Sequence, residues 1–189
     1  KNADLIDDIP YAQFGDMIVI FNVIVSDNDE GIGSIRITNQ MINTWKINLA
    51  QLIEIAYENT KKMFPMLLQP MGTIVLEMLD RMDAPEEDKE MFRNEAPNTL
   101  YVLTNTRKQN GAYFITDREV LLDCANEIGV NKLYILPSSI HEIILLPMQD
   151  DECANEEELF KMVKEVNATQ VAPSEVLADN VYVFDAKIS

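Results

Sequence analysis

The alternation of hydrophobic and polar positions in the first third of the chain predicts paired strands. Residues 17–25 are rich in β-branched side chains on both parities, a pattern typical of a strand that is covered on both faces. Turn-forming residues follow at 27–31. Ile35 and Ile37 then alternate with polar residues, so we expect a half-exposed strand over 34–38 that forms a hairpin with the first.

Helical periodicity is clearest after Asn48. Asn48 and Gln51 have the spacing of a capping box, and apolar residues then recur at intervals of three or four until Pro65 stops the helix. Residues 71–79 fit either a strand or a helix. Residues 80–97 are the most charged stretch of the chain, and we expect a short helix within them.

The second half of the chain has the pattern of several short strands. We predict strands over 99–104, 112–115, 133–136, 143–146 and 181–186. Asn110 and Gly111 form a strong turn signal between the first two of these segments. Pro137 and the residues that follow it connect the third segment to the fourth.

Two further helices are predicted in this half by their start signals. Thr116 with Glu119 and Asn155 with Glu158 both have the spacing of a capping box. Gly129 is well placed to end the first of these helices. We therefore expect helices over about 116–128 and 155–166.

The resulting element order is β-β-α-β, an acidic connection, and then β-β-α-β-β-α-β. Connections of hairpin size favour antiparallel pairing, so we expect an α+β fold with mostly antiparallel sheet and about three main helices. The length suits a single domain over residues 1–189, or two associated halves, 14–79 and 98–189, joined by the acidic connection 80–97.

The composition is that of a globular protein with a strongly acidic surface. Hydrophobic residues make up 47% of the 189 positions, and 32 acidic against 15 basic residues give a formal net charge of −17. Such a surface repels phosphate groups, so we expect neither nucleic acid nor an anionic membrane as a partner. The longest apolar run, residues 17–25, is also far shorter than the ~20 residues that a bilayer requires.

Cysteine and histidine are too few for a disulfide framework or a zinc site. The chain has one His and two Cys, Cys124 and Cys153, which indicates a reducing, cytoplasmic location. Cys124 falls on the apolar side of its predicted helix and should be an inert core thiol. The acidic turn 27–31 lacks the ligand spacing of a calcium loop, and Gly31 and Gly33 lack the context of a dinucleotide loop. We therefore expect no metal and no cofactor.

The most concentrated chemical signal lies in the connection that follows residue 136. Ser138, Ser139, the sole histidine His141 and Glu142 stand within five positions. A serine nucleophile needs a base within hydrogen-bonding reach and a third group that orients the base. The chain has no Gly-x-Ser-x-Gly motif, however, and serine hydroxyls in turns routinely satisfy backbone groups. A turn with an architectural role is the stronger interpretation.

Several stretches together resemble an uncharacterised domain-of-unknown-function family that is widespread in gut bacteria. They are Leu52 to Pro65, Leu100 to Asn105, Leu133 to Ile144 and Val166 to Asp179, and the resemblance spans nearly the whole chain. It implies a bacterial protein whose N-terminal part, a charged helical segment, precedes Lys1 in the full-length chain. It implies no activity, cofactor or catalytic residue.

Two classes of function fit these observations. The first is a non-catalytic intracellular binding module with a protein or small-molecule partner, for which no complete catalytic set is needed. The alternative is a hydrolase that uses Ser138 or Ser139 with His141. A structural subunit of a larger assembly also stays open, and the oligomeric state is not determined. The candidate contact residues are Thr104, Asn105, Ser138, Ser139, His141 and Glu142.

Overall fold

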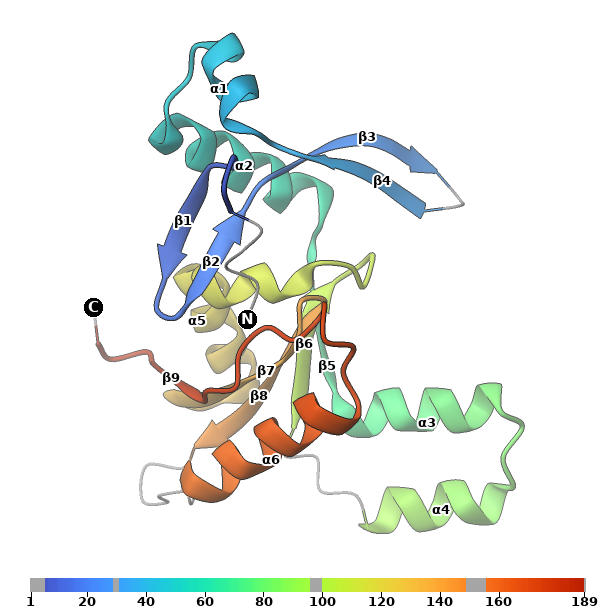
Figure 1. The fold of residues 1–189 in the computed structure, drawn as a ribbon. Coiled ribbons are helices and arrows are strands. Elements are labelled where there is room, and N and C mark those ends of the chain that lie inside the picture. Colours follow the sequence, from blue (N-terminus) through green and yellow to red (C-terminus); the bar gives the residue numbers. More distant parts are fainter. Residues whose placement is uncertain (1–5, 29–30, 96–99, 149–155, 189) are drawn as a thin grey trace. The chain divides into compact units, whose positions relative to one another are not determined.

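The computed structural model describes residues 6–28, 31–95, 100–148 and 156–188. The chain divides into two compact units, Lys1–Pro65 and Met66–Ser189, and each is described by itself below. We predicted a junction within 80–97, whereas the units divide at Pro65. Both units combine helices with antiparallel strands, which confirms the α+β prediction (Figure 1).

The first unit contains two separate hairpins. Strand β1 (Tyr11–Phe14) pairs with β2 (Met17–Ile20), and β3 (Asn22–Asn28) pairs with β4 (Gly31–Arg36). The strand predicted over 17–25 is therefore divided between β2 and β3. Phe21 lies between them, buries its side chain and accepts a hydrogen bond from the amide of Ile37, so the chain changes direction at this residue.

Two helices complete the first unit. Helix α1 (Asn39–Trp45), which the sequence pattern did not indicate, is capped by Thr38. Helix α2 (Leu49–Met63) begins with the predicted capping box of Asn48 and Gln51, which the structure confirms. Phe21, Ile37 and Leu52 form a buried hydrophobic cluster in this unit, surrounded by half-buried hydrophobic residues.

The second unit is built on a five-stranded antiparallel sheet. Its strand order is β5-β6-β8-β7-β9. The strands are β5 (Met66–Pro70), β6 (Tyr101–Asn105), β7 (Lys132–Ser139), β8 (Glu142–Met148) and β9 (Tyr182–Asp185). The central strands carry four completely buried side chains, which are those of Leu103, Leu133, Ile143 and Leu145. The sheet therefore supplies the main hydrophobic core of this unit.

The helices of the second unit are interspersed with the strands along the chain. They are α3 (Met71–Arg81), α4 (Glu86–Glu95), the 3₁₀ helix η2 (Gly111–Thr116), α5 (Arg118–Ile128) and α6 (Glu156–Thr169). Helix α6 packs against β7, and η2 packs against β6 and β8. Helix α3 leaves from the edge strand β5 and forms a hairpin with α4 beside the sheet (Figure 1).

Three predictions are corrected or refined by the structure, and a fourth is not tested by it. The described residues contain seven helices, including η2, rather than about three. The ambiguous segment 71–79 is helical. The strand predicted over 112–115 is part of η2, in which Ala112, Phe114 and Ile115 are buried together on a tight helical turn. The predicted capping pair of Asn155 and Glu158 involves a position outside the described residues.

Helix α5 starts one residue later than predicted. Asp117, not Thr116, is its N-cap, and the Asp117 carboxylate accepts hydrogen bonds from the amides of Glu119 and Val120. The Thr116 hydroxyl donates to the Tyr113 carbonyl instead. Gly129 ends the helix with a φ of 85°, as predicted. Among the described residues, no helix combines the length and apolar character that a bilayer crossing requires.

Candidate functional site

The candidate residues meet where β6 ends and the β7–β8 hairpin turns. Thr104 and Asn105 are the last residues of β6 and are almost completely buried, at 4% and 1% exposure. His141 lies in the turn between β7 and β8. Since β6 pairs with β8, residues far apart in the sequence are brought to one end of the sheet. The structure thus brings four of the predicted residues together with Asn110 and Gly111 in one cluster, which we call the Thr104–His141 network (Thr104, Asn105, Asn110, Gly111, Ser139 and His141).

The carbonyl oxygen of His141 is the centre of this network. It accepts a hydrogen bond of 2.8 Å from the Thr104 hydroxyl and one of 2.9 Å from the Gly111 amide. A Cβ atom at position 111 would lie 2.5 Å from Thr104 Oγ1 and 2.6 Å from the His141 carbonyl oxygen. Only a glycine allows this approach, so Gly111 fastens η2 to the hairpin turn.

Asn105 holds the loop that leads to Gly111. Its Oδ1 accepts hydrogen bonds from the amides of Arg107 and Gln109, and its Nδ2 donates to the Gln109 carbonyl at 2.7 Å. The Lys108 amide donates to the Asn105 carbonyl. The Asn105 side chain therefore provides the hydrogen-bond partners that the backbone of this loop would find in a helix or a strand, as asparagine often does in turns.

The imidazole of His141 uses both nitrogens within the protein. Nδ1 accepts a hydrogen bond of 3.2 Å from the Asn110 amide, so the neutral ring carries its proton on Nε2. Nε2 faces Glu175 Oε1 at 3.8 Å, and both side chains are partly exposed. The Glu175 carbonyl also accepts a hydrogen bond from the Ile140 amide, which brings this distant segment to the turn.

The two serines have partners other than the imidazole. Ser139 Oγ accepts a hydrogen bond of 3.1 Å from the backbone amide of His141, and Ser138 Oγ lies 3.5 Å from Glu142 Oε1. In the part of the chain that the structure describes, neither hydroxyl is hydrogen-bonded to the ring. A general base for a serine must lie within about 2.6–3.2 Å of the hydroxyl. The arrangement is suited to fixing a turn rather than to activating a nucleophile.

Other reactive groups among the described residues do not form a site. No group of three or more His, Cys, Asp or Glu side chains within the described ranges is placed to bind a metal ion. Cys124 is buried, as predicted, and its Sγ lies 3.7 Å from Met66 Sδ. Burial, with smaller contributions from Glu127 and Asp123, raises the pKa of the Cys124 thiol to about 12, so it stays protonated at neutral pH.

Sequence reasoning missed two members of this cluster, Asn110 and Gly111, and also Glu175, which lies beside it. The Asn110-Gly111 pair was recognised only as a turn signal, and nothing in the sequence linked Glu175 to a turn more than thirty positions earlier. The signal that could have found Gly111 was its place beside a buried apolar run, where a glycine often marks a close backbone approach.

A comparison of the whole chain with known proteins identifies its family. The model of the Family of unknown function (DUF5688) matches residues 1–186. The chain belongs to this family. The resemblance inferred from the sequence is thereby confirmed as to the family, whose description assigns no activity. No curated protein matches the chain significantly, and neither does any solved structure.

Proposed function

We propose that this domain is a non-catalytic binding module of a bacterial, cytoplasmic protein. The proposal rests on the hydrogen bonds of the two candidate catalytic groups in the Thr104–His141 network. The His141 imidazole accepts a hydrogen bond from the Asn110 backbone amide, and the Ser139 hydroxyl accepts one from the His141 backbone amide. Side chains engaged in this way support a fold and leave no free general base. A free, buried Cys124 thiol supports the assignment to a reducing compartment.

Exposed hydrophobic side chains supply a positive reason for binding. Large apolar residues that remain exposed on one element mark protein contacts more often than residues scattered singly. Met78, Met82 and Met91, at 55%, 78% and 61% exposure, lie on two helices of one hairpin. A partner protein that covers such side chains would gain the free energy of removing them from water.

In-cell cross-linking followed by mass spectrometry tests the proposal. The tagged full-length protein is expressed in its source organism, cross-linked and purified under denaturing conditions. We expect a reproducible adduct with one protein or a few. Uniform background without a reproducible adduct at native expression would contradict the proposal.

The polar candidates remain possible contact residues and need a separate variant. Thr104 and Asn105 are too deeply buried to touch a partner, which leaves the half-buried candidates Ser138, Ser139, His141 and Glu142. The double change of Ser138→Ala and Glu142→Gln removes polar surface while it keeps both hydrogen bonds of the His141 ring and amide. If the adducts persist unchanged in this variant, these residues are not the contact surface.

The hydrolase alternative has a simple chemical test. A fluorophosphonate probe labels serines that are activated as nucleophiles. Because neither serine is bonded to the imidazole, we expect no adduct on Ser138 or Ser139. A stoichiometric adduct on either residue that is lost in a His141→Ala variant would establish the enzyme instead.

A further inference from the structure

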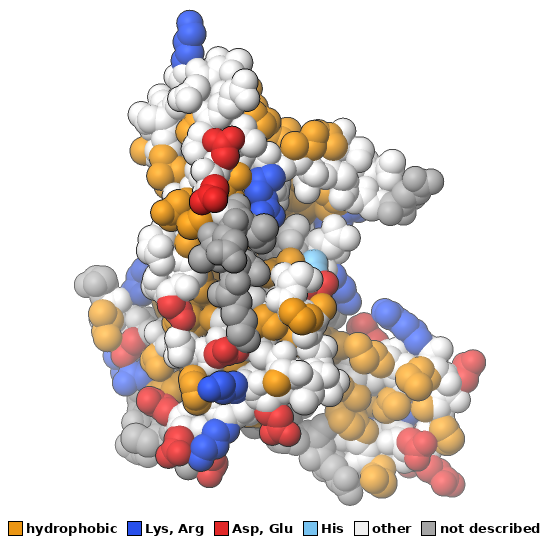
Figure 2. All heavy atoms as spheres, in the orientation of Figure 1, with side chains coloured by type: hydrophobic (Ala, Val, Ile, Leu, Met, Phe, Trp, Pro, Cys, Tyr) orange, Lys and Arg blue, Asp and Glu red, His pale blue; other side chains and the backbone are white. Residues whose placement is uncertain are grey.

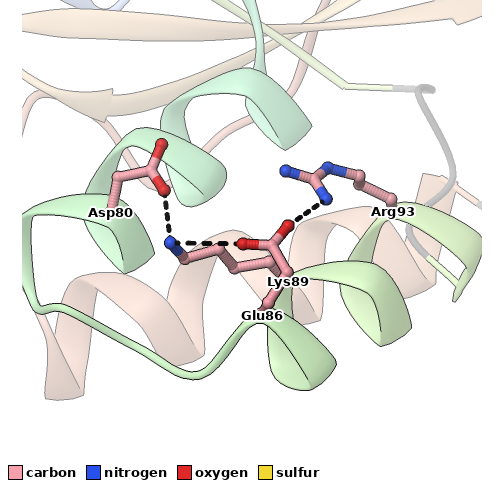
Figure 3. Close-up of polar contacts among 4 residues, drawn as sticks. All are labelled: Asp80, Glu86, Lys89 and Arg93. Atoms are coloured by element: carbon pink, nitrogen blue, oxygen red, sulfur yellow. Dashed lines mark hydrogen bonds and ion pairs between the residues drawn. The ribbon is translucent and has the colours of Figure 1, made fainter.

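Among the described residues, one ion pair joins the two helices of the α3–α4 hairpin, and two more lie within α4. Lys89 Nζ lies 2.6 Å from Asp80 Oδ1 and 3.7 Å from Glu86 Oε2, and Arg93 Nη1 lies 2.8 Å from Glu86 Oε1 (Figure 3). The hydrogen bond from Lys89 lowers the pKa of the Asp80 carboxyl group. The Lys89–Asp80 pair thus bridges α3 and α4, while Met78, Met82 and Met91 stay exposed.

Helix α3 is apolar over most of its length, and its large hydrophobic residues are half-buried except for Met78, which is exposed. Six of its eleven residues are large hydrophobic residues, and Gly72 is the only residue of this helix that is buried. Ile74, Met78 and Met82 follow one another at intervals of four, so they lie on one side of the helix. We call these three side chains the methionine face. Met78 and Met82 are 55% and 78% exposed.

Acidic residues surround this apolar surface. Figure 2 shows hydrophobic side chains gathered over the α3–α4 hairpin with acidic side chains around them. Residues 71–93 contain seven acidic and three basic residues, a formal charge of −4. All three basic side chains are engaged in ion pairs, with Glu77, Asp80 and Glu86. Asp83, Glu87 and Asp88 are exposed and are not among the acidic residues of these three ion pairs.

We propose that the methionine face binds a lysine- and arginine-rich amphipathic helix of a partner protein. This inference rests on the proposed binding function and names its surface and the chemistry of its partner. Methionine side chains are flexible and polarizable and adapt to the apolar face of a bound helix, while carboxylates at the margin attract cationic side chains. An anionic membrane or a second copy of this chain, at a net charge of −17, would be repelled by the same carboxylates.

Methyl NMR of the full chain tests this assignment directly. The ten methionines are labelled with ¹³C at the methyl group, and a model peptide of leucine and lysine with helical periodicity is added. We expect the Met78 and Met82 resonances to shift in a saturable way, and the shifts to weaken as salt is raised. Met162, which is 42% exposed on α6, is the internal control and should not shift.

Two comparisons make the result decisive. A peptide with the same leucines but glutamate in place of lysine should leave all methionine resonances unchanged. Replacing Met78 and Met82 by Gln should weaken binding of the leucine–lysine peptide at least tenfold, whereas Met162→Gln should not change it. The inference is overturned if Met78 and Met82 do not shift, if Met162 shifts equally, or if the glutamate peptide binds as well.

Failure of this inference can be told apart from failure of the proposed function. If the NMR test is negative but in-cell cross-linking yields a reproducible adduct, the module binds through another surface. If the NMR test is positive but no adduct forms in cells, the face binds cationic helices in solution and the proposed cellular function is wrong.

Discussion

Two regions of the second unit use their side chains in opposite ways. In the Thr104–His141 network, polar side chains are buried and bonded to the backbone, with Asn105 only 1% exposed. In the α3–α4 hairpin, hydrophobic side chains are exposed, with Met82 at 78%. The residues that suggest chemistry in the sequence therefore hold the fold. The exposed residues that look like ordinary core positions in the sequence are the ones that we propose for binding.

Replacing Gly111 by Ala should give the largest effect and would sharpen this contrast. The added methyl group would overlap Thr104 Oγ1 and the His141 carbonyl oxygen, so we expect a loss of about 2–3 kcal/mol in unfolding free energy. Urea denaturation measures this loss. It is followed by circular dichroism rather than by tryptophan fluorescence, because the only tryptophan, Trp45, lies in the first unit and Gly111 lies in the second.

The matched control for this change is Met82→Ala on the exposed hairpin. Its side chain contributes little to burial, so a change within about 0.5 kcal/mol is expected. Equal losses for the two variants would contradict the division between a structural network and an open binding face.

Replacing Asn105 by Ala should cost about 2 kcal/mol of unfolding free energy. The change leaves the amides of Arg107 and Gln109 without the buried carboxamide oxygen that they share. Asn126→Ala is the control, since Asn126 is exposed on α5 and alanine favours helix. A native-like stability for Asn105→Ala would mean that the loop does not depend on this side chain.

Replacing His141 by Ala should cost about 1 kcal/mol, because the Asn110 amide loses its acceptor at a partly exposed site. His141→Asn offers an acceptor oxygen near the position of Nδ1 and should recover part of the loss. Thermal denaturation of the three proteins measures the order. If asparagine restores nothing, the hydrogen bond from Asn110 is not what stabilises the turn.

The smallest effect is expected for Asp80→Asn. The lowered pKa of Asp80 means that its pairing with Lys89 stabilises the fold above the unfolded-state pKa of about 4 and is lost as the pH falls through the lower folded-state pKa. The stability difference between wild type and variant should thus be small at neutral pH and vanish in acid. Glu165→Gln on α6 is the control. A stability difference between wild type and Asp80→Asn that grows as the pH falls would contradict the lowered pKa of Asp80.

Local signals in the sequence predicted the start of one helix and the end of another. The capping box at Asn48 and the C-terminal Gly129 gave α2 and the end of α5 correctly. Helix α3 stayed ambiguous because it is apolar on most sides, which weakens helical periodicity. The 3₁₀ helix η2 was predicted as a strand because short buried apolar runs fit either structure.

The candidate site was predicted in its members but not in their arrangement. Ser139 and His141 are neighbours in the sequence, yet the contact runs from the His141 amide to the serine hydroxyl rather than between the side chains. The hydrogen bonds from Thr104 and Gly111 to the His141 carbonyl are revealed only by the tertiary structure, since they depend on the pairing of β6 with β8 and on the close approach of Gly111.

Hydrogen exchange at the hairpin turn tests the central account most directly. The amides of Asn110, Gly111 and His141 all lie outside regular strand pairing, and each donates to a group of the network. We predict that the Gly111 and His141 amides exchange as slowly as those of the central strands, and that His141→Ala removes protection from Asn110 alone. Exchange of Gly111 and His141 at the rate of an unstructured peptide would contradict the account.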